Sequence, residues 1–112
     1  MPELPEVETT RRGLAPRVAG RTIRAVVIRD RRLRWPVPSD LEARLRGRRV
    51  EAIRRRGKYL LFDCGTGCLL VHLGMSGSLT LVRATSAPRL HDHADIVLDT
   101  GEAVRFNDPR RF

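Results

Sequence analysis

The first two residues of the chain, Met1 and Pro2, could supply a nucleophile. An initiator methionine before a small residue is commonly trimmed, and Pro2 would then present a free secondary amine. Such an amine can attack an aldehyde-like carbon and form an iminium, the chemistry by which lysine amines form Schiff bases. Two carboxylates, Glu3 and Glu6, follow closely and could donate or accept protons. The alternative is structural, because a proline at a helix start costs nothing there.

Lys58 is a second candidate for covalent chemistry or proton transfer. It is the only lysine among 22 basic residues, and all the others are arginines. Arginine keeps its proton under ordinary conditions, whereas lysine can release one, so a position kept as lysine is where amine chemistry could be needed. The composition leaves open that one lysine survived by chance.

The positive charge is concentrated in the first half of the chain. The formal net charge is +9, and residues 1–56 hold 16 basic and 7 acidic side chains. The arginines within 29–34, 48–49 and 54–56 are candidates for phosphate contacts, although any one of them could simply be solvated surface. A small, strongly basic domain favours a polyanionic partner, of which nucleic acid is the commonest.

The cysteines and the apolar runs limit the class of protein. Cys64 and Cys68 are too few for a secreted disulfide framework and lack the second pair of a cysteine zinc site, so we interpret them as core thiols. The chain has no run of 18 apolar residues and opens on acidic sequence. We therefore expect a soluble cytoplasmic protein that does not engage a membrane.

Two segments have the pattern of helices. Apolar residues recur on one face from Glu3 to about Val18, and Gly20 suits the end of that helix. Ser39 and Glu42 have the spacing of a capping box, which predicts a second, shorter helix that begins there and stops at residue 47.

The rest of the chain has the pattern of short strands, and tight turns are expected at 65–67 and 100–102. We predict one domain, 1–112, that is mainly β within the α+β class. Its architecture is an antiparallel β-sandwich of seven to eight strands flanked by an N-terminal helix and a second short helix. The predicted strands are Thr22 to Arg29, Val50 to Arg54, Tyr59 to Asp63, Leu69 to Leu73, Ser78 to Val82, Asp95 to Leu98 and Ala103 to Phe106.

Five motifs, in order, connect these features. They are Pro2-Glu3-Leu4-Pro5-Glu6-Val7-Glu8-Thr9, Lys58-Tyr59-Leu60-Leu61, His72-Leu73-Gly74-Met75-Ser76-Gly77, His91-Asp92-His93 and Asp108-Pro109-Arg110-Arg111-Phe112. Together they resemble the N-terminal catalytic domain of the formamidopyrimidine-DNA glycosylases in order and spacing, over the entire chain.

The resemblance implies base-excision DNA repair by a bifunctional DNA glycosylase and AP lyase that removes oxidised purines, such as 8-oxoguanine and formamidopyrimidines. Pro2 matches the family's nucleophile, which forms a Schiff base with the sugar C1′. Glu3 matches the glycosylase proton donor, and Lys58 matches the lysine assigned to β-elimination. Glu6 matches a supporting carboxylate, although favourable placement at a helix N-terminus explains it equally well.

Three further residues match side chains that fill the duplex when the damaged nucleotide is flipped out: Met75, Arg110 and Phe112. Taken singly, each has a simpler interpretation. Met75 could fill a gap in the core, Arg110 could contact a phosphate, and Phe112 could be a buried anchor.

The three histidines carry different expectations. His91 matches a DNA contact of the family, as Arg110 does, and His72 lies in the segment that approaches the DNA backbone. For His72 and His93 a structural role is the stronger interpretation. We expect His91 and His93 to face opposite sides of a strand, which argues against a metal site.

The resemblance also implies parts that this chain lacks. Complete family proteins continue with a helix-two-turn-helix segment and a zinc finger that grip the DNA. We therefore expect no cofactor in this chain, with zinc only in the complete protein. The expected partner is double-stranded DNA containing oxidised purines or abasic sites, bound by a monomer in the bacterial cytoplasm at the nucleoid. Alone, the chain should excise bases weakly or not at all, and a non-catalytic basic DNA-binding module is the alternative.

Overall fold

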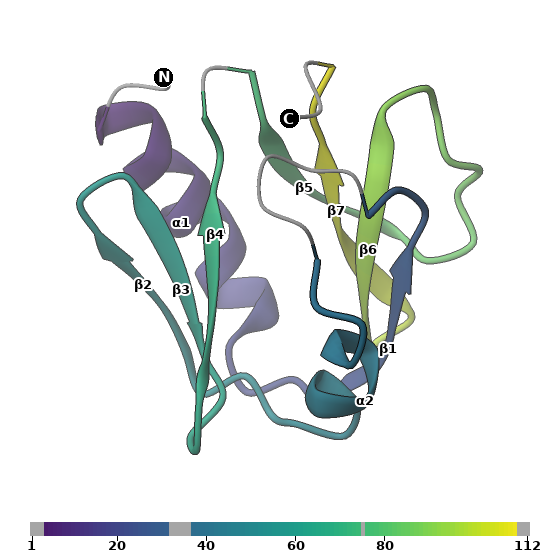
Figure 1. The fold of residues 1–112 in the computed structure, drawn as a ribbon. Helices are drawn as coiled ribbons and strands as arrows, with labels where there is room; N and C mark the ends of the chain where they lie inside the picture. Colours follow the sequence, from purple (N-terminus) through teal and green to yellow (C-terminus); the bar gives the residue numbers. More distant parts are fainter. Residues whose placement is uncertain (1–3, 32–36, 75, 110–112) are drawn as a thin grey trace.

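The computed structural model describes residues 4–31, 37–74 and 76–109 of the chain, which fold into a β-sandwich with two helices (Figure 1). The elements are α1 (Leu4–Val18), β1 (Ile23–Ile28), α2 (Leu41–Leu45), β2 (Ala52–Arg56), β3 (Tyr59–Asp63), β4 (Cys68–His72), β5 (Ser78–Arg83), β6 (Asp92–Leu98) and β7 (Glu102–Asn107). One sheet has four strands in the order β1-β6-β7-β5, and the other has three in the order β2-β3-β4. Neighbouring strands in both sheets are antiparallel.

The predicted fold class is confirmed, including the two tight turns. The turn at 65–67 joins β3 to β4, and the turn predicted at 100–102 lies at 99–101, where it joins β6 to β7. Gly65 and Gly101 have φ of 82° and 87°, the left-handed conformation that glycine adopts without a steric penalty. Neither helix in the described ranges has the length and apolar character needed to cross a membrane.

The helix α1 lies against both sheets, since it contacts β2 and β3 of one and β5 of the other. Val7, Leu14 and Val18 are buried along its inner face, as the hydrophobic pattern predicts. Gly20, with φ of 85°, ends the helical segment. The side chains of α1 therefore join a single core between the sheets, whose largest fully buried members include Phe62, Ile23, Leu60 and Leu98.

The predicted bounds of β2 are wrong by two residues at each end, because the strand begins at Ala52 and runs through all three arginines to Arg56. Three consecutive charges suggest a loop, but β2 is an edge strand that pairs only with β3. An edge strand can carry charges on its exposed positions. Arg54 Nη2 lies 3.3 Å from Asp63 Oδ2 across this hairpin.

Two smaller predictions are also wrong. The residue before α2 is Asp40, whose side chain makes no capping hydrogen bond, and Glu42 is bound to Arg31 instead of closing a capping box. The hydrogen bond from Arg31 also lowers the pKa of Glu42.

Cys64 is buried as expected, but Cys68 is exposed, because it faces outward at the start of the edge strand β4.

Candidate functional site

Antiparallel connections bring five segments to one end of the sandwich. The start of α1, the β2–β3 turn, the end of β4, the start of β6 and the end of β7 all lie at the upper end in Figure 1. We call this end the site edge and define it as residues 4–8, 56–59, 72–77, 90–93 and 107–109. It holds the described candidates Glu6, Lys58, His72 and His91.

Lys58 occupies a two-residue turn between β2 and β3. Arg56 pairs with Tyr59, which leaves only Gly57 and Lys58 outside the ladder. Gly57 has φ of 59°, and a left-handed glycine at the first turn position matches the twist of the flanking strands. Lys58 is therefore exposed at the tip of a short, well-defined hairpin.

An ion pair ties this hairpin to the start of α1. The Arg55 side chain donates to Glu8 Oε1 at 3.1 Å and to the carbonyl oxygen of Gly57 at 3.0 Å. Glu8 also accepts hydrogen bonds from Arg11 and Arg12 of its own helix. The hydrogen bonds from Arg11, followed by those from Arg55 and Arg12, outweigh desolvation and lower the pKa of Glu8 to about 2.

Glu8 was not among the residues predicted for the site. The sequence shows it only as one of three acidic residues at a helix start, and its link to Arg55 spans 47 positions. Glu6, which was predicted, is exposed on the same first turns of α1.

His72 lies beside the hairpin through strand pairing. It is the cross-strand partner of Tyr59, and the two ring centroids are 4.8 Å apart. Tyr59 directly follows Lys58, so His72 pairs with the residue next to the lysine. Tyr59 keeps 42% of its surface exposed, so this ring pair is accessible at the site edge.

Asp108 connects the two sheets at the site edge. Its carboxylate accepts a hydrogen bond from Ser76 Oγ at 2.5 Å, and its carbonyl oxygen lies 2.7 Å from His93 Nε2. Ser76 belongs to the β4–β5 loop, which is tightly closed: Gly77 N–H donates to the carbonyl oxygen of Leu73 at 2.8 Å. A Cβ at position 77 would lie 2.2 Å from that oxygen, so this loop requires glycine.

The expected separation of His91 and His93 is wrong. Their ring centroids are 6.1 Å apart in an edge-on arrangement. Residues two positions apart on a regular strand share a face, so strand alternation does not separate His91 from His93. His91 also precedes β6 with φ of 70°, and the register between Asp92 and Ala94 is irregular. In the described ranges, no group of three or more His, Cys, Asp or Glu side chains forms a possible metal cluster.

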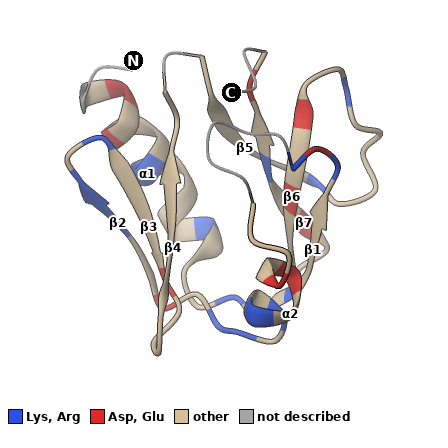
Figure 2. Ribbon diagram, in the orientation of Figure 1, with Lys and Arg blue, Asp and Glu red and all other residues tan. Residues whose placement is uncertain are grey.

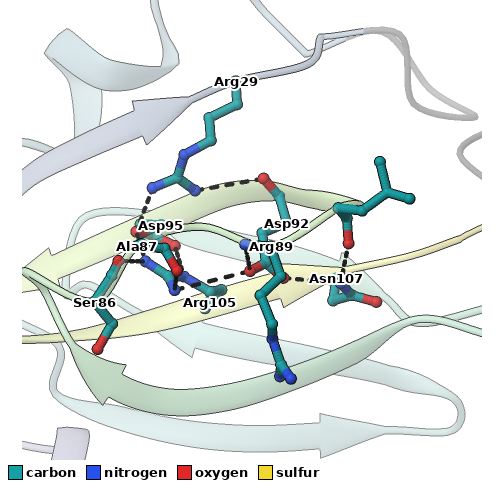
Figure 3. A network of polar contacts seen from close by, with 9 residues as sticks. Arg29, Ser86, Ala87, Arg89, Asp92, Asp95, Arg105 and Asn107 are labelled. Carbon is teal, nitrogen blue, oxygen red and sulfur yellow. Dashed lines mark hydrogen bonds and ion pairs between the residues drawn. The ribbon is translucent and has the colours of Figure 1, made fainter.

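A buried ionic network supports this part of the four-stranded sheet (Figure 3). Arg105 binds Asp95 through two hydrogen bonds of 2.8 and 2.9 Å and donates to the carbonyl oxygens of Ser86 and Ala87. Arg29 adds a 2.8 Å bond to Asp95. Burial would raise the pKa of Asp95, but the hydrogen bonds from Arg105 and Arg29 prevail and lower it to about 2.

This network changes the interpretation of the arginine clusters. Arg29, a candidate for phosphate contacts, binds the buried carboxylate of Asp95, whereas Arg54 and Arg55 form ion pairs with 69% and 32% of their side chains still exposed. Figure 2 shows Lys and Arg on β2 and, at the opposite end of the sandwich, around α2. The basic residues of that second group are Arg44, Arg46, Arg48 and Arg49.

Five of the predicted site residues lie outside the described residues, and the structure does not test their roles. They are Pro2, Glu3, Met75, Arg110 and Phe112.

Comparisons with known proteins agree along the whole chain. Residues 1–112 match the family model for the formamidopyrimidine-DNA glycosylase N-terminal domain. The chain is 60% identical to formamidopyrimidine-DNA glycosylase of Stutzerimonas stutzeri and 55% identical to that of Pseudomonas aeruginosa, each over 112 residues. Each alignment covers 100% of this chain but only 42% of the length of the relative.

Solved structures show the same similarity. The Lactococcus lactis enzyme bound non-covalently to DNA with an AP site matches 99% of this chain, with a TM-score of 0.90 and 34% identity. The same enzyme in complex with DNA containing FAPY-dG matches 98%, with a TM-score of 0.89 and 33% identity. The alignments cover 43% and 42% of those chains, respectively.

Proposed function

The chain belongs to the formamidopyrimidine-DNA glycosylase family, and we propose that it forms the catalytic part of a DNA repair enzyme that excises oxidised purines and cleaves the strand. The observation that carries the proposal is the Glu8–Arg55 ion pair, which joins the start of α1 to the hairpin that presents Lys58. The helix α1 begins two residues after Pro2 in the sequence, so this ion pair ties the described segment that follows Pro2 to the Lys58 hairpin.

The proposed reaction begins at Pro2 once Met1 has been removed. The Pro2 nitrogen attacks C1′ of the damaged nucleotide, the bond from C1′ to the base breaks, and Glu3 gives the departing base its proton. The C1′–O4′ bond then opens as the proton of the Pro2 nitrogen passes to O4′, which becomes a hydroxyl and leaves an iminium between the Pro2 nitrogen and C1′. Glu6, one turn along, supports proton transfer at this amine.

Lys58 acts in the second half of the proposed reaction. The iminium makes the C2′ proton acidic, and the Lys58 amine removes it while the 3′ phosphate leaves and a C2′–C3′ double bond forms. Water then hydrolyses the iminium and frees Pro2. An exposed lysine at a hairpin tip suits this role, because its ammonium can also hold the departing phosphate.

The remaining predicted residues would bind the DNA. We propose that Met75, Arg110 and Phe112 fill the space left by the flipped nucleotide, and that His72 and His91 contact the backbone. The preferred partner is double-stranded DNA that carries an oxidised purine or an abasic site, bound by a monomer in the bacterial cytoplasm at the nucleoid.

The chain spans less than half the length of its relatives, so further DNA contacts are proposed for the remainder of the family sequence. There we place the helix-two-turn-helix segment and the zinc finger. Cys64 and Cys68 cannot provide a four-cysteine site, because they are the two cysteines of this sequence and such a site needs two more. We accordingly propose that these residues need no cofactor.

Borohydride trapping tests the catalytic role directly. Borohydride reduces an iminium to a stable amine, so the chain incubated with abasic-site DNA should give a covalent adduct, and Pro2→Gly should lose it. Mass spectrometry must first establish that Met1 is removed. No adduct from the trimmed chain, with DNA binding retained, would instead support the non-catalytic basic DNA-binding module that the net charge of +9 also allows.

A further inference from the structure

His91 has a backbone conformation that residues other than glycine seldom adopt. Its φ is 70°, and it is the one described non-glycine residue with a positive value. A side chain at such a position is strained and persists only where the surrounding contacts impose the conformation. Such residues are concentrated at binding sites, so the contacts that impose this one are informative.

The side-chain amide of Asn107 bonds to both neighbours of His91. It donates to the carbonyl oxygen of Leu90 at 3.2 Å and to Asp92 Oδ1 at 2.8 Å. Figure 3 shows the Asn107 amide and the backbone of Arg89 both directed at the Asp92 carboxylate. The Arg89 N–H donates to its second oxygen at 2.7 Å.

The residue that follows β7 completes the set. Asp108 N–H donates to the carbonyl oxygen of His91 itself at 3.1 Å. Asn107 is the last residue of β7 and pairs with Asp92, the first residue of β6. The end of one central strand therefore holds the turn from which its neighbour begins, with His91 in the middle.

We infer that Asn107 is a positioning residue for His91: its amide, bonded to Leu90 and Asp92, holds the His91 backbone in the left-handed conformation and so sets the direction of the imidazole. The part of the inference that concerns DNA rests on the proposed function, in which His91 contacts a phosphate of the DNA backbone. The part that concerns the backbone conformation of His91 does not depend on DNA.

Asn107→Leu tests the inference, since leucine has a similar size and no amide. In the 112-residue chain, we expect the strong intraresidue HN–Hα NOE that marks a positive φ at residue 91 to be lost. An NOE that persists unchanged would overturn the inference, whatever DNA binding shows.

DNA binding supplies the second measurement, with a duplex that contains a stable abasic-site analogue. Asn107→Leu and His91→Ala should each lower affinity about three- to tenfold, and the double variant should fall no further than either. Full additivity would overturn the link between the two residues. If His91→Ala leaves affinity unchanged, the proposed DNA contact fails, while the NOE still decides the role of Asn107.

Val104→Ala is the matched control for loss of stability. Val104 is buried in the same strand, and its truncation removes core packing without touching residues 89–92. At a temperature where this variant is folded, its DNA affinity and the residue 91 NOE should match those of the unmodified chain. A parallel loss of affinity in this control would show that Asn107→Leu acts only through stability.

Discussion

Asp95 keeps a negative charge inside the molecule because two arginines surround it. Its side chain is only 2% exposed, and that of Arg105 is 6% exposed. A charge at this depth is tolerated when it is paired and fully hydrogen-bonded, and removal of one partner leaves the other uncompensated. Asp95→Asn should therefore lower the free energy of unfolding by about 3–5 kcal/mol in denaturant titrations.

Asp63→Asn provides a comparison for that variant. Asp63 pairs with Arg54, whose side chain is 69% exposed, and an exposed pair of this kind contributes at most about 1 kcal/mol. Equal losses in the two variants would mean that the Asp95 network is no more important for stability than a surface pair.

The same carboxyl gives a pH dependence with a defined sign. The pKa of Asp95 is lowered from 3.8 to about 2 in the folded chain. The ionised form is thus favoured by folding, and its contribution is present above about pH 4 and is lost as the pH falls towards about 2. The free energy of unfolding, measured at a series of acid pH values, should show this loss in the unmodified chain. In Asp95→Asn it should change less over the same pH interval.

At the scale of elements, the relation between α1 and the β2–β3 hairpin controls the proposed chemistry. Glu8→Gln removes the charge that Arg55 binds, so the helix start and the lysine turn would lose the ion pair between them while the apolar packing of α1 remains. We expect single-turnover cleavage of abasic-site DNA to slow about two- to tenfold, because a small misplacement of reacting groups costs rate.

Glu102→Gln is the control at the other end of the same helix. Glu102 binds Arg17 at 2.8 Å, so this variant also removes an ion pair between α1 and a strand, but away from the site edge. Its cleavage rate should equal that of the unmodified chain. Equal slowing in both variants would show that α1 docking in general, rather than the hairpin link, sets the rate.

The elements also show what sequence patterns can and cannot predict. The helix α1 follows from the periodic spacing of its apolar residues, and the strand β3 follows from a short apolar run bounded by turns. The start of β6 was missed because Asp92 and His93 look like loop residues, although both are buried. Their burial depends on partners such as Asn107, which local sequence does not reveal.

Part of the site was predictable for a different reason. Lys58 stands out by residue type and His91 by a family motif, so neither required knowledge of tertiary contacts. Glu8, Ser76 and Asn107 position other residues, and their partners lie 47, 32 and 15 or more positions away. Common side chains with distant partners carry no local signal.

At the scale of the whole molecule, the chain represents 42% of the length of its relatives. We expect it to bind damaged DNA weakly and to excise little base by itself, because the proposed remaining phosphate contacts lie elsewhere in the family sequence. Fusion to the remaining part of the Stutzerimonas stutzeri relative should make excision of 8-oxoguanine measurable in an oligonucleotide assay. The same fusion carrying Pro2→Gly is the control, and excision by that control would contradict the proposed nucleophile.

The hydrogen bond from Ser76 to Asp108 links a loop that leaves the three-stranded sheet to the segment that follows the central strand of the other sheet. Moving the two sheets apart at that end would break the hydrogen bond between the Ser76 hydroxyl and the Asp108 carboxylate. If this end binds DNA as proposed, the hydrogen bond fixes part of the binding surface already in the folded chain, and we expect less ordering entropy to be lost on association.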